Sequence, residues 1–562
     1  MNTEKAGGYI SQITFNNGES LDILQNDIVV FVGPNNAGKS QSLKDIYALS
    51  EMKRPTVVIT DIKTTKYDAS ILSALTKAAT GENHGDFTIF RILGRGVNFR
   101  KFSDKQFQEE PYFGEYRDLF VANLDTSARL IICSPPGNIG RNGNKAHPIH
   151  YAAFDGRYRK WLSDSFKRAF DIEVTPNTQY GALIPLCMGK PVILTGEYED
   201  EQSRQEKYAE ILETYKQVQD QGDGIKSFAG ILLYLMLDYY CTYLIDEPES
   251  FLHPPQARIM GQIIGQTLSE HQQAFISTHS EEIIKGLLEV CPDRIKVIRI
   301  TREEDNNKFS ILNNHEFQQV WSDPLLRYSN IMASLFHQSV VLCESDSDCK
   351  VYSIIENYIK QKKGKYSETL FIHCGGKHRM AKVITALRSL NIEAKLIVDI
   401  DVLNDETVFK GIVSACGVDY SAIRTAYTDI VSNLHSSKEI VKRAIAKAAI
   451  NQILDNGKST NLTNREIKDI REAIATTSKW DGIKHAGVSA IPSGNATASF
   501  RMMDQLLRKN DIFIVPVGEL ECFVKEVGGH GPDWANAVLE AYPNLDDSVY
   551  VPIIKFIESM NL

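Results

Sequence analysis

A buried strand, a glycine-rich loop and a helix follow one another close to the start of the chain. Asp27–Val32 is almost wholly apolar, and residues 41–52 have the spacing of a helix. Between them, Gly33-Pro-Asn-Asn-Ala-Gly-Lys-Ser40 fits the pattern G-x-x-x-x-G-K-[ST] at every fixed position. Glycines let main-chain amides wrap a phosphate, and a following helix N-terminus adds a favourable dipole. The segment therefore predicts a nucleotide-binding α/β domain. The alternative, a glycine turn that matches by chance, is disfavoured by the strand and helix on either side.

Within this loop two side chains have specific expected roles. Lys39 should reach the β- and γ-phosphates of ATP, and Ser40 should ligate Mg²⁺. The remaining loop residues that we assign to nucleotide binding are Gly33, Asn35, Asn36 and Gly38.

A second motif, Tyr243-Leu-Ile-Asp-Glu-Pro-Glu249, ends an apolar strand in carboxylates. Asp246 is expected to hold the Mg²⁺ sphere and also to belong to the nucleotide site, and Glu247 is expected to polarise the attacking water. Alone, this pattern fits an acidic strand end facing solvent equally well; after the complete glycine loop that interpretation is disfavoured. His279 follows the apolar strand 274–277 and can touch the γ-phosphate. A lone histidine is usually structural, so its assignment rests on its order in the chain.

The order GPNNAGKS, IDEPESFLHP and STHS resembles the ABC ATPases, especially the branch of chromosome-maintenance and break-repair ATPases. This resemblance implies nucleotide held between two heads, and hence a homodimer or a higher homo-oligomer formed through them. The family's LSGGQ signature is absent, and Gly222–Phe228 occupies its slot. There we expect Gly224 and Ser227 to contact phosphate. The family's Q-loop glutamine is not assigned.

A second series of strands and helices begins near residue 339. The apolar strand Val340–Cys343 runs into Glu344, and the apolar strand Leu396–Val398 runs into Asp399 and Asp401. Carboxylates at the ends of neighbouring strands can converge, and oxygen ligands suit Mg²⁺ or Mn²⁺. Such a centre can activate water against a phosphodiester. Either fragment alone is more often a structural or solvated strand end.

The order of a glutamate, the Gly375-Gly376 turn and D-x-D resembles a Toprim domain. Two features depart from that family: Ser345 stands where a glycine is usual, and a long segment separates D-x-D from the last acidic motif. Lys484 and Lys525 are candidates for the lysine that some members use to stabilise the transition state. The resemblance implies these metal ligands: Glu344, Asp348, Asp399, Asp401, Glu519 and Glu521.

An ABC head followed by a Toprim domain resembles the OLD (overcoming lysogenization defect) nucleases, whose relatives include Gabija-type and retron-associated defence effectors. The resemblance implies an ATP-binding and ATP-hydrolysing DNA endonuclease that depends on Mg²⁺ or Mn²⁺ and serves in antiphage defence. It also suggests a reverse transcriptase with its RNA–DNA product as one candidate partner. The alternative is an ATP-dependent regulatory or binding switch with an inactive Toprim domain. The catalytic residues implied are Glu247, His279, Glu344, Asp399 and Asp401.

Strands alternating with helices predict an α/β fold with parallel sheets in both halves. We expect an ABC-type ATPase head over 1–320, with a mixed or helical insertion at about 60–215. A Toprim domain with a Rossmann-like parallel sheet should follow over 321–562, with a helical insert at about 405–510. Residues 303–308 are predicted to form a charged turn.

The remaining composition limits partners and compartment. A net charge of −9 argues against coating nucleic acid but allows a local basic groove. The basic and aromatic segment 154–168 could contact DNA, although a solvated helix face with core aromatics is the favoured interpretation. No apolar stretch suits a membrane span, and the nine cysteines include no C-x-x-C pair. We therefore expect a cytoplasmic protein without membrane contact.

Overall fold

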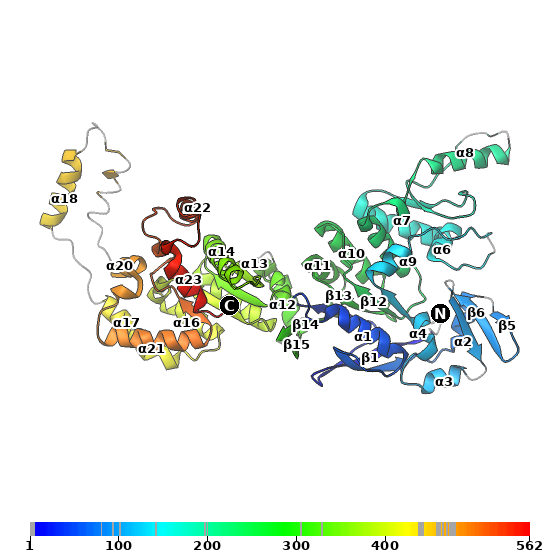
Figure 1. The fold of residues 1–562 in the computed structure, drawn as a ribbon, viewed down its shortest axis with the longest axis horizontal. Coiled ribbons are helices and arrows are strands. Elements are labelled where there is room, and N and C mark those ends of the chain that lie inside the picture. Colours follow the sequence, from blue (N-terminus) through cyan, green and yellow to red (C-terminus); the bar gives the residue numbers. More distant parts are fainter. Residues whose placement is uncertain are drawn as a thin grey trace. The chain divides into compact units, whose positions relative to one another are not determined.

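The protein consists of two compact units, Met1–Gln318 and Gln319–Leu562 (Figure 1). Their structure is a computed structural model, and each unit is described by itself. The structure describes residues 6–79, 81–92, 95–100, 103–140, 143–195, 198, 200–303, 306–327, 330–435, 443–456, 462–463, 466–467, 470 and 479–562.

The first unit is built on a six-stranded sheet in the order β15-β14-β3-β13-β12-β8. All neighbouring strands are parallel except the pair β14 and β15, which form an antiparallel hairpin. Every residue of β3 is buried, as expected for a central strand covered on both faces. The strands are β3 (Ile28–Val32), β8 (Val121–Leu124), β12 (Thr242–Asp246), β13 (Gln273–Ser277), β14 (Ile295–Glu303) and β15 (Asn306–Ile311).

Helices and a small antiparallel sheet complete the core of this unit. The sheet has the order β2-β1-β4, and its apolar side chains join those of the main sheet and of helix α1 in one buried cluster. Helices α10 and α11 lie side by side (Figure 1). The elements are β1 (Gly8–Phe15), β2 (Ser20–Asp22), β4 (Ile59–Lys66), α1 (Lys39–Glu51), α9 (Asp223–Leu235), α10 (Pro254–Thr267) and α11 (Glu281–Val290).

The segment at about 60–215 is mixed, and it contributes β8 to the edge of the main sheet. It also forms two small antiparallel sheets, β5-β6-β7 and, with β11, β11-β10-β9. Its elements are α2 (Ile71–Ala78), β5 (Gly81–Asn83), β6 (Phe87–Ile92), β7 (Arg95–Arg100), α3 (Ser103–Glu109), α4 (Arg117–Phe120), α5 (Thr126–Ile131), α6 (Pro148–Phe154), α7 (Gly156–Phe170), β9 (Val174–Pro176), β10 (Leu186–Met188), α8 (Glu201–Glu213) and β11 (Lys216–Gln217).

The second unit is built on a four-stranded parallel sheet in the order β17-β16-β18-β19. Its strands are β16 (Ser339–Cys343), β17 (Thr369–His373), β18 (Ala394–Val398) and β19 (Ile512–Ile514). Strands β16 and β18 match the apolar strands predicted at 340–343 and 396–398. Because all four are parallel, their carboxyl ends meet at one edge, where the acidic motifs follow β16, β18 and β19.

Helices surround this sheet, and where the segment 405–510 is described it is helical. Within it α17 and α21 lie side by side (Figure 1). The helices are α12 (Asn314–Ser322), which begins in the first unit, α13 (Pro324–Arg327), α14 (Asp346–Lys362), α15 (Met380–Ser389), α16 (Glu406–Ala415), α17 (Ser421–His435), α18 (Arg443–Asn456), α20 (Lys479–Ala486), α21 (Asn495–Lys509), α22 (Pro532–Ala541) and α23 (Val551–Glu558). Within the described ranges, every helix is too short or too polar to cross a membrane.

Candidate nucleotide site and candidate metal centre

The loop that begins at Gly33 connects β3 to α1. At Gly33 itself there is no space for a side chain. Gly33 has φ 141°, and a Cβ there would lie 1.9 Å from the carbonyl oxygen of Ile300. Asn36 and Gly38 also have positive φ, 59° and 105°. Backbones of this kind form concave nests of N–H groups that bind anions. The backbone of this loop is therefore suited to an anion such as a phosphate.

Lys39 is buried inside this loop. Its Nζ donates hydrogen bonds to the carbonyl oxygens of Gly33 at 2.9 Å and Pro34 at 2.6 Å. Burial lowers the pKa of Lys39 to about 8, although the charges of nearby carboxylates, Glu247 foremost, oppose that shift. Ser40 is half-buried beside it, whereas Asn35 and Asn36 are exposed on the outer part of the loop. The ammonium group thus lies between the loop and the acidic strand end.

The acidic motif lies at the end of β12, next to the end of β13. The Ser277 hydroxyl donates to Asp246 Oδ1. Glu247 has φ 47°, an uncommon conformation for a residue other than glycine. Its Oε1 lies 3.6 Å from His279 Nε2, and its Oε2 accepts from the Ser250 hydroxyl at 3.1 Å. The structure therefore brings together Glu247 and His279, which the sequence assigns to one site.

Two further residues of this site were not predicted. Glu249 is half-buried, and its carboxylate accepts from the main-chain N–H of His279 at 2.6 Å; desolvation raises the pKa of Glu249. Burial, followed by the positive charge of Lys39, lowers the pKa of His279.

Arg129, in α5, is the second residue of the nucleotide site that the sequence analysis did not predict. Its side chain is fully buried, and its Nη1 donates to the carbonyl oxygens of Asp246 at 2.6 Å and Glu247 at 3.1 Å. The short segment that carries it has no recognisable motif, so only the fold reveals the contact.

The segment that occupies the signature slot forms the start of α9. Gly224 packs against the loop after the acidic motif, where an added Cβ would lie 2.5 Å from the carbonyl oxygen of Phe251. Ser227 lies one turn further on and is fully buried, and its hydroxyl has no partner among the described residues. Gly222 and Asp223 are the exposed residues of this segment. The geometry therefore leaves Gly224 near the surface and Ser227 inside the core.

The basic helix α7 has the features of a solvated helix with an apolar inner face. Lys160 and Lys167 form ion pairs with Asp164 and Glu173 at 2.7 and 2.9 Å. Phe166 is fully buried and stacks on Phe170. Lys160 and Lys167 are therefore paired with acids, and the Phe166 ring belongs to the core.

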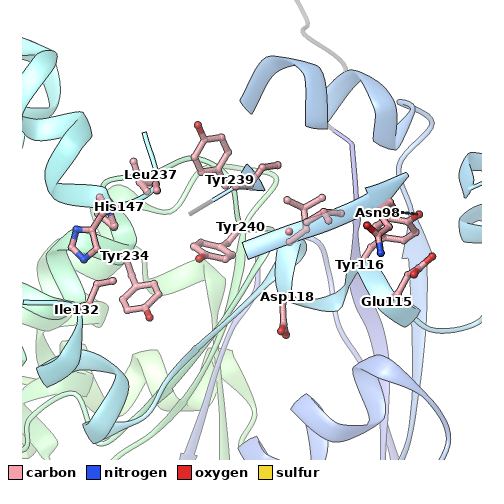
Figure 2. A pocket seen from close by; sticks show the side chains of 16 residues that line it. Asn98, Glu115, Tyr116, Asp118, Ile132, His147, Tyr234, Leu237, Tyr239 and Tyr240 are labelled. Atoms are coloured by element: carbon pink, nitrogen blue, oxygen red, sulfur yellow. Dashed lines mark hydrogen bonds between the residues drawn. The ribbon is translucent and has the colours of Figure 1, made fainter. Parts of the chain in front are cut away.

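A separate cavity of about 380 Å³ lies in the first unit (Figure 2). It is lined by parts of β6, β7, α6 and the segment after α9, and Tyr116, Tyr234 and His147 are among the side chains that border it (Figure 2). Among the described residues that line it, two are carboxylates and none is lysine or arginine. That lining does not suit a phosphate, and none of the predicted nucleotide residues belongs to it.

In the second unit, the predicted carboxylates converge at the carboxyl end of the sheet. Glu344 follows β16, and Asp399 and Asp401 follow β18, the adjacent strand. One ligand oxygen from each lies within 4.8 Å of the other two. The main-chain N–H of Asp399 donates to Glu344 Oε1 at 3.4 Å, and Lys377 Nζ lies 2.8 Å from Asp401 Oδ2.

The electrostatics of this cluster fit a divalent cation. Burial and the charge of Asp401 raise the pKa of Glu344 to about 7. Burial and the charge of Glu344 raise the pKa of Asp399 well above its usual range. The buried Oδ1 of Asp401 has no hydrogen-bond partner among the described residues. Three close carboxylates, one with an orphaned oxygen, are the kind of oxygen donors that Mg²⁺ or Mn²⁺ prefers.

Asp348 lies in the first turn of α14, and its hydrogen bonds with Ser345 explain why a serine stands where a glycine is usual. The Ser345 hydroxyl accepts from the Asp348 N–H at 3.3 Å, and Asp348 Oδ2 accepts from the Ser345 N–H at 2.9 Å. This reciprocal pair is a capping box, in which serine at the helix N-cap satisfies an otherwise unpaired amide. Burial raises the pKa of Asp348, and the charge of Glu521 adds to it. Asp348 therefore lies between the first cluster and the last acidic motif.

Glu519 and Glu521 bring the last acidic motif to the same edge. Glu519 is buried, and its carboxylate lies 3.1 Å from Lys484 Nζ. Glu521 Oε1 lies 2.6 Å from His530 Nδ1. Of the two candidate lysines, Lys484 from α20 is thus beside the carboxylates, whereas Lys525 is exposed outside them. The long segment after D-x-D returns a helix to the site, a contact that sequence distance conceals.

Comparisons with known proteins match one segment in each unit. Residues 157–285 match the family model "AAA domain, putative AbiEii toxin, Type IV TA system". Residues 335–401 match the model "Overcoming lysogenization defect protein-like, TOPRIM domain". The chain has the domain architecture of the OLD family. OLD-type architecture joins an ATPase domain, which implies nucleotide, to a Toprim domain, which implies a divalent metal.

A curated relative and several solved structures are also similar. The chain is 26% identical over 167 residues to the "Old nuclease" of Escherichia phage P2, and the match spans 29% of this chain and only 28% of the phage protein. An SMC head bound to the C-terminal winged-helix domain of ScpA has 12% identity and a TM-score of 0.34, covering 55% of this chain and 99% of that one. The SMC head domain from Thermotoga maritima has 12% identity and a TM-score of 0.29, covering 54% and 99%.

Proposed function

We propose that this OLD-type chain is an ATP-binding and ATP-hydrolysing, metal-dependent DNA endonuclease. The observation that carries the proposal is the convergence of Glu344, Asp399 and Asp401 at one end of a parallel sheet, inside a domain that matches the OLD-like Toprim model. These three carboxylates are close and partly buried; Lys377 pairs with Asp401, while burial and neighbouring carboxylates raise the pKa of Glu344 and of Asp399. Folding energy is spent to hold them together, which favours a functional role.

In the proposed ATPase site, the loop amides and Lys39 hold the phosphates, and Ser40 with Asp246 holds Mg²⁺. Glu247 orients the attacking water. Its carboxylate is held by the Ser250 hydroxyl and lies beside His279, which can sense the γ-phosphate. By resemblance to ABC ATPases, two heads would share the nucleotide, with Gly224 at the surface that meets the partner.

In the proposed nuclease site, the chain's own residues supply donors and positive charge. When bound, Mg²⁺ or Mn²⁺ would lower the pKa of a water molecule and polarise the scissile phosphate. Glu344, Asp399 and Asp401 provide oxygen donors, and Asp348, Glu519 and Glu521 extend them. Lys377 offsets the charge of Asp401. Lys484, beside Glu519, puts an ammonium group where a phosphodiester gains negative charge.

The biological role that we propose is antiphage defence, with ATP state coupled to cutting. The support for this role is the resemblance to OLD nucleases and their defence relatives, and we propose a reverse transcriptase with its RNA–DNA product as a candidate partner on the same resemblance. The competing function is an ATP-dependent switch whose Toprim carboxylates bind metal without cleaving DNA.

One nuclease assay separates the two functions. Plasmid and single-stranded DNA are incubated with the full chain and Mg²⁺ or Mn²⁺, with and without ATP. We expect metal-dependent cutting that is lost in Asp399→Ala and altered in its ATP response in Lys39→Ala. Glu526→Ala, an exposed acid close in sequence to the site, is the matched control and should cut normally. Cutting by Asp399→Ala at the parental rate would refute the nuclease site, and absence of cutting by the parent would favour the switch.

A further inference from the structure

Beside the oxygen cluster lies a group of side chains with different donors. One ligand atom each from His485, Glu519 and Cys522 lies within 4.8 Å of the other two. We propose that these three residues form a site for a thiophilic divalent cation, Zn²⁺, distinct in metal preference from the cluster of Glu344, Asp399 and Asp401. The site shares Glu519 with the proposed nuclease centre, but the binding itself does not depend on nuclease activity.

The main chain holds the three donors in a fixed arrangement. Glu519 and Cys522 lie on one tight turn, where the Cys522 N–H donates to the Glu519 carbonyl oxygen at 3.1 Å. His485 lies near the end of α20. Gly518 has φ 115°, and a Cβ there would lie 2.0 Å from the carbonyl oxygen of Lys484. Because the two backbones touch at this glycine, α20 cannot slide relative to the turn without losing the contact.

Burial of the donors fits a metal site with an open position. The side chains of Glu519 and Cys522 are buried, whereas that of His485 is 71% exposed. A cation can therefore enter from solvent past the imidazole and meet a carboxylate and a thiol beneath it. Three protein ligands leave the fourth tetrahedral position for water. On binding, the Cys522 thiol would release its proton to solvent and bind as thiolate.

The donor types decide which metal is favoured. Thiolate and imidazole select Zn²⁺ over Mg²⁺, while carboxylates alone suit Mg²⁺ and Mn²⁺. Of the three candidate metal groups found among the described residues, this is the one that contains a cysteine. The simplest competing interpretation is that Cys522 is a core thiol, as the other buried cysteines are. That interpretation predicts that metal binding does not depend on the Cys522 thiol.

Zinc at this site would act on the proposed nuclease centre. Glu519 Oε2 lies 3.1 Å from Lys484 Nζ and Glu519 Oε1 lies 3.6 Å from His485 Nδ1. A cation bound by Glu519 and His485 would repel the Lys484 ammonium and replace its ion pair. This consequence rests on the proposed function: Zn²⁺ is expected to inhibit Mg²⁺-dependent cutting, and the inhibition should be weaker in Cys522→Ser.

Cobalt spectroscopy and zinc titration test the binding without using activity. The metal-free full chain is titrated with Co²⁺, and the near-ultraviolet thiolate-to-cobalt charge-transfer band is recorded; Zn²⁺ is then added in competition. We expect the band to saturate at one Co²⁺ per chain and to disappear when Zn²⁺ replaces the bound Co²⁺. Cys522→Ser should abolish the band, and it and His485→Gln should weaken Zn²⁺ binding by more than about tenfold. Cys416→Ser, another buried cysteine, is the matched control and should keep the band.

Further variants keep the result decisive. His485 is largely exposed, so His485→Gln carries the test if Cys522→Ser does not fold. Asp399→Asn should retain the band, because the oxygen cluster is not part of the site. The proposal is overturned if the folded parent shows no thiolate band, or if Cys522→Ser binds Zn²⁺ as tightly as the parent. It is equally overturned if His530→Gln, but not His485→Gln, weakens Zn²⁺ binding, since the donors would then be the Glu519, Glu521 and His530 group.

Discussion

Arg129 Nη1 donates a 2.6 Å hydrogen bond to the carbonyl oxygen of Asp246, the residue that ends strand β12. A second bond of 3.1 Å goes to the carbonyl oxygen of Glu247, whose φ of 47° is a strained conformation. The backbone of Arg129 also packs closely against helix α9, which follows the segment in place of the LSGGQ signature. The contact is at Gly230, where an added Cβ would lie 2.1 Å from the Arg129 carbonyl oxygen. One buried guanidinium thus fixes the backbone that aims the proposed water-orienting carboxylate.

Replacing this guanidinium should reduce ATP hydrolysis more than ATP binding. In Arg129→Met, the Asp246 carbonyl oxygen loses the guanidinium donor, at a cost of about 1–3 kcal/mol in unfolding free energy, while the Glu247 carbonyl oxygen keeps only the Ser250 N–H among these donors. Glu247 can then relax from its strained φ, so we expect kcat for ATP to fall by about tenfold or more with a smaller change in KM. Steady-state ATPase kinetics and thermal unfolding measure both effects. Arg117→Met, which breaks a partly exposed arginine's ion pairs with Glu51 and Asp118, is the control for loss of an arginine. Unchanged kcat in the folded Arg129→Met protein would contradict the positioning role.

Gly33 should not tolerate a side chain. Its φ of 141° disfavours any L-residue, and a Cβ would lie 1.9 Å from a main-chain oxygen of β14. We expect Gly33→Ala to abolish binding of a fluorescent ATP analogue and to lower the unfolding temperature. Gly156→Ala is the matched control, because an added Cβ there meets nothing within 4 Å and the position is helical; it should be neutral or slightly stabilising. Normal ATP binding by Gly33→Ala would mean that the loop is held differently from this description.

Some strands could be predicted from the sequence and others could not. The strands β3, β12, β13 and β16 were predictable because each is a short apolar run that ends at a loop motif. Strand β15 was not: residues 303–308 were predicted as a charged turn, yet Asn306–Ile311 pairs with β14. A polar edge strand is defined by its partner across the ladder, which local pattern does not reveal.

The same limit applies to the sites. Carboxylates at strand ends were predictable since a parallel sheet gathers them at one edge. Arg129, Glu249, His530 and the pairing of Lys484 with Glu519 depend on contacts between segments distant in sequence or without any motif. Ser227 was predicted to contact phosphate from its slot in the motif order, and in the fold its side chain is buried.

Lys66 offers a pH-dependent test of the first unit. Its Nζ lies 4.3 and 4.1 Å from the ring centres of Phe107 and Phe113 and donates to the Tyr112 carbonyl oxygen. Burial lowers the pKa of Lys66 to about 7 from 10.5. Between these values the unfolded chain binds a proton that the folded chain lacks, so this group's contribution to stability rises with pH over that window. Lys66→Met should therefore be more stable than the parent near pH 7, and the advantage should shrink towards pH 9.5. Thermal unfolding at several pH values measures it, and a constant difference across that range would contradict the lowered pKa.

Ser345 should act as a helix cap whose role glycine partly replaces. Ser345→Ala removes the hydroxyl that accepts from the Asp348 N–H, and N-cap serine to alanine costs about 1 kcal/mol. Ser345→Gly, which restores the residue usual in Toprim domains, should cost only a few tenths of a kcal/mol. Chemical unfolding of the two variants gives the difference. Equal losses, or no loss in Ser345→Ala, would indicate that the capping box does not stabilise α14.

The proposed metal centre should be destabilising without metal and stabilising with it. Asp399 is half-buried near Glu344, Asp348 and Asp401, and desolvation together with these charges raises its pKa well above the usual range. Asp399→Asn removes one negative charge while keeping the shape, so with a chelator the variant should melt at a higher temperature than the parent. A gain of 1 kcal/mol corresponds to about 2–4 °C for a unit of this size. Addition of Mg²⁺ or Mn²⁺ should raise the parent's melting temperature but not the variant's, because ligand that binds only the folded state stabilises it. Glu526→Gln, outside the cluster, should respond to metal as the parent does. If Asp399→Asn is destabilised with a chelator, or gains as much as the parent from metal, these carboxylates are not a metal centre held together against their repulsion.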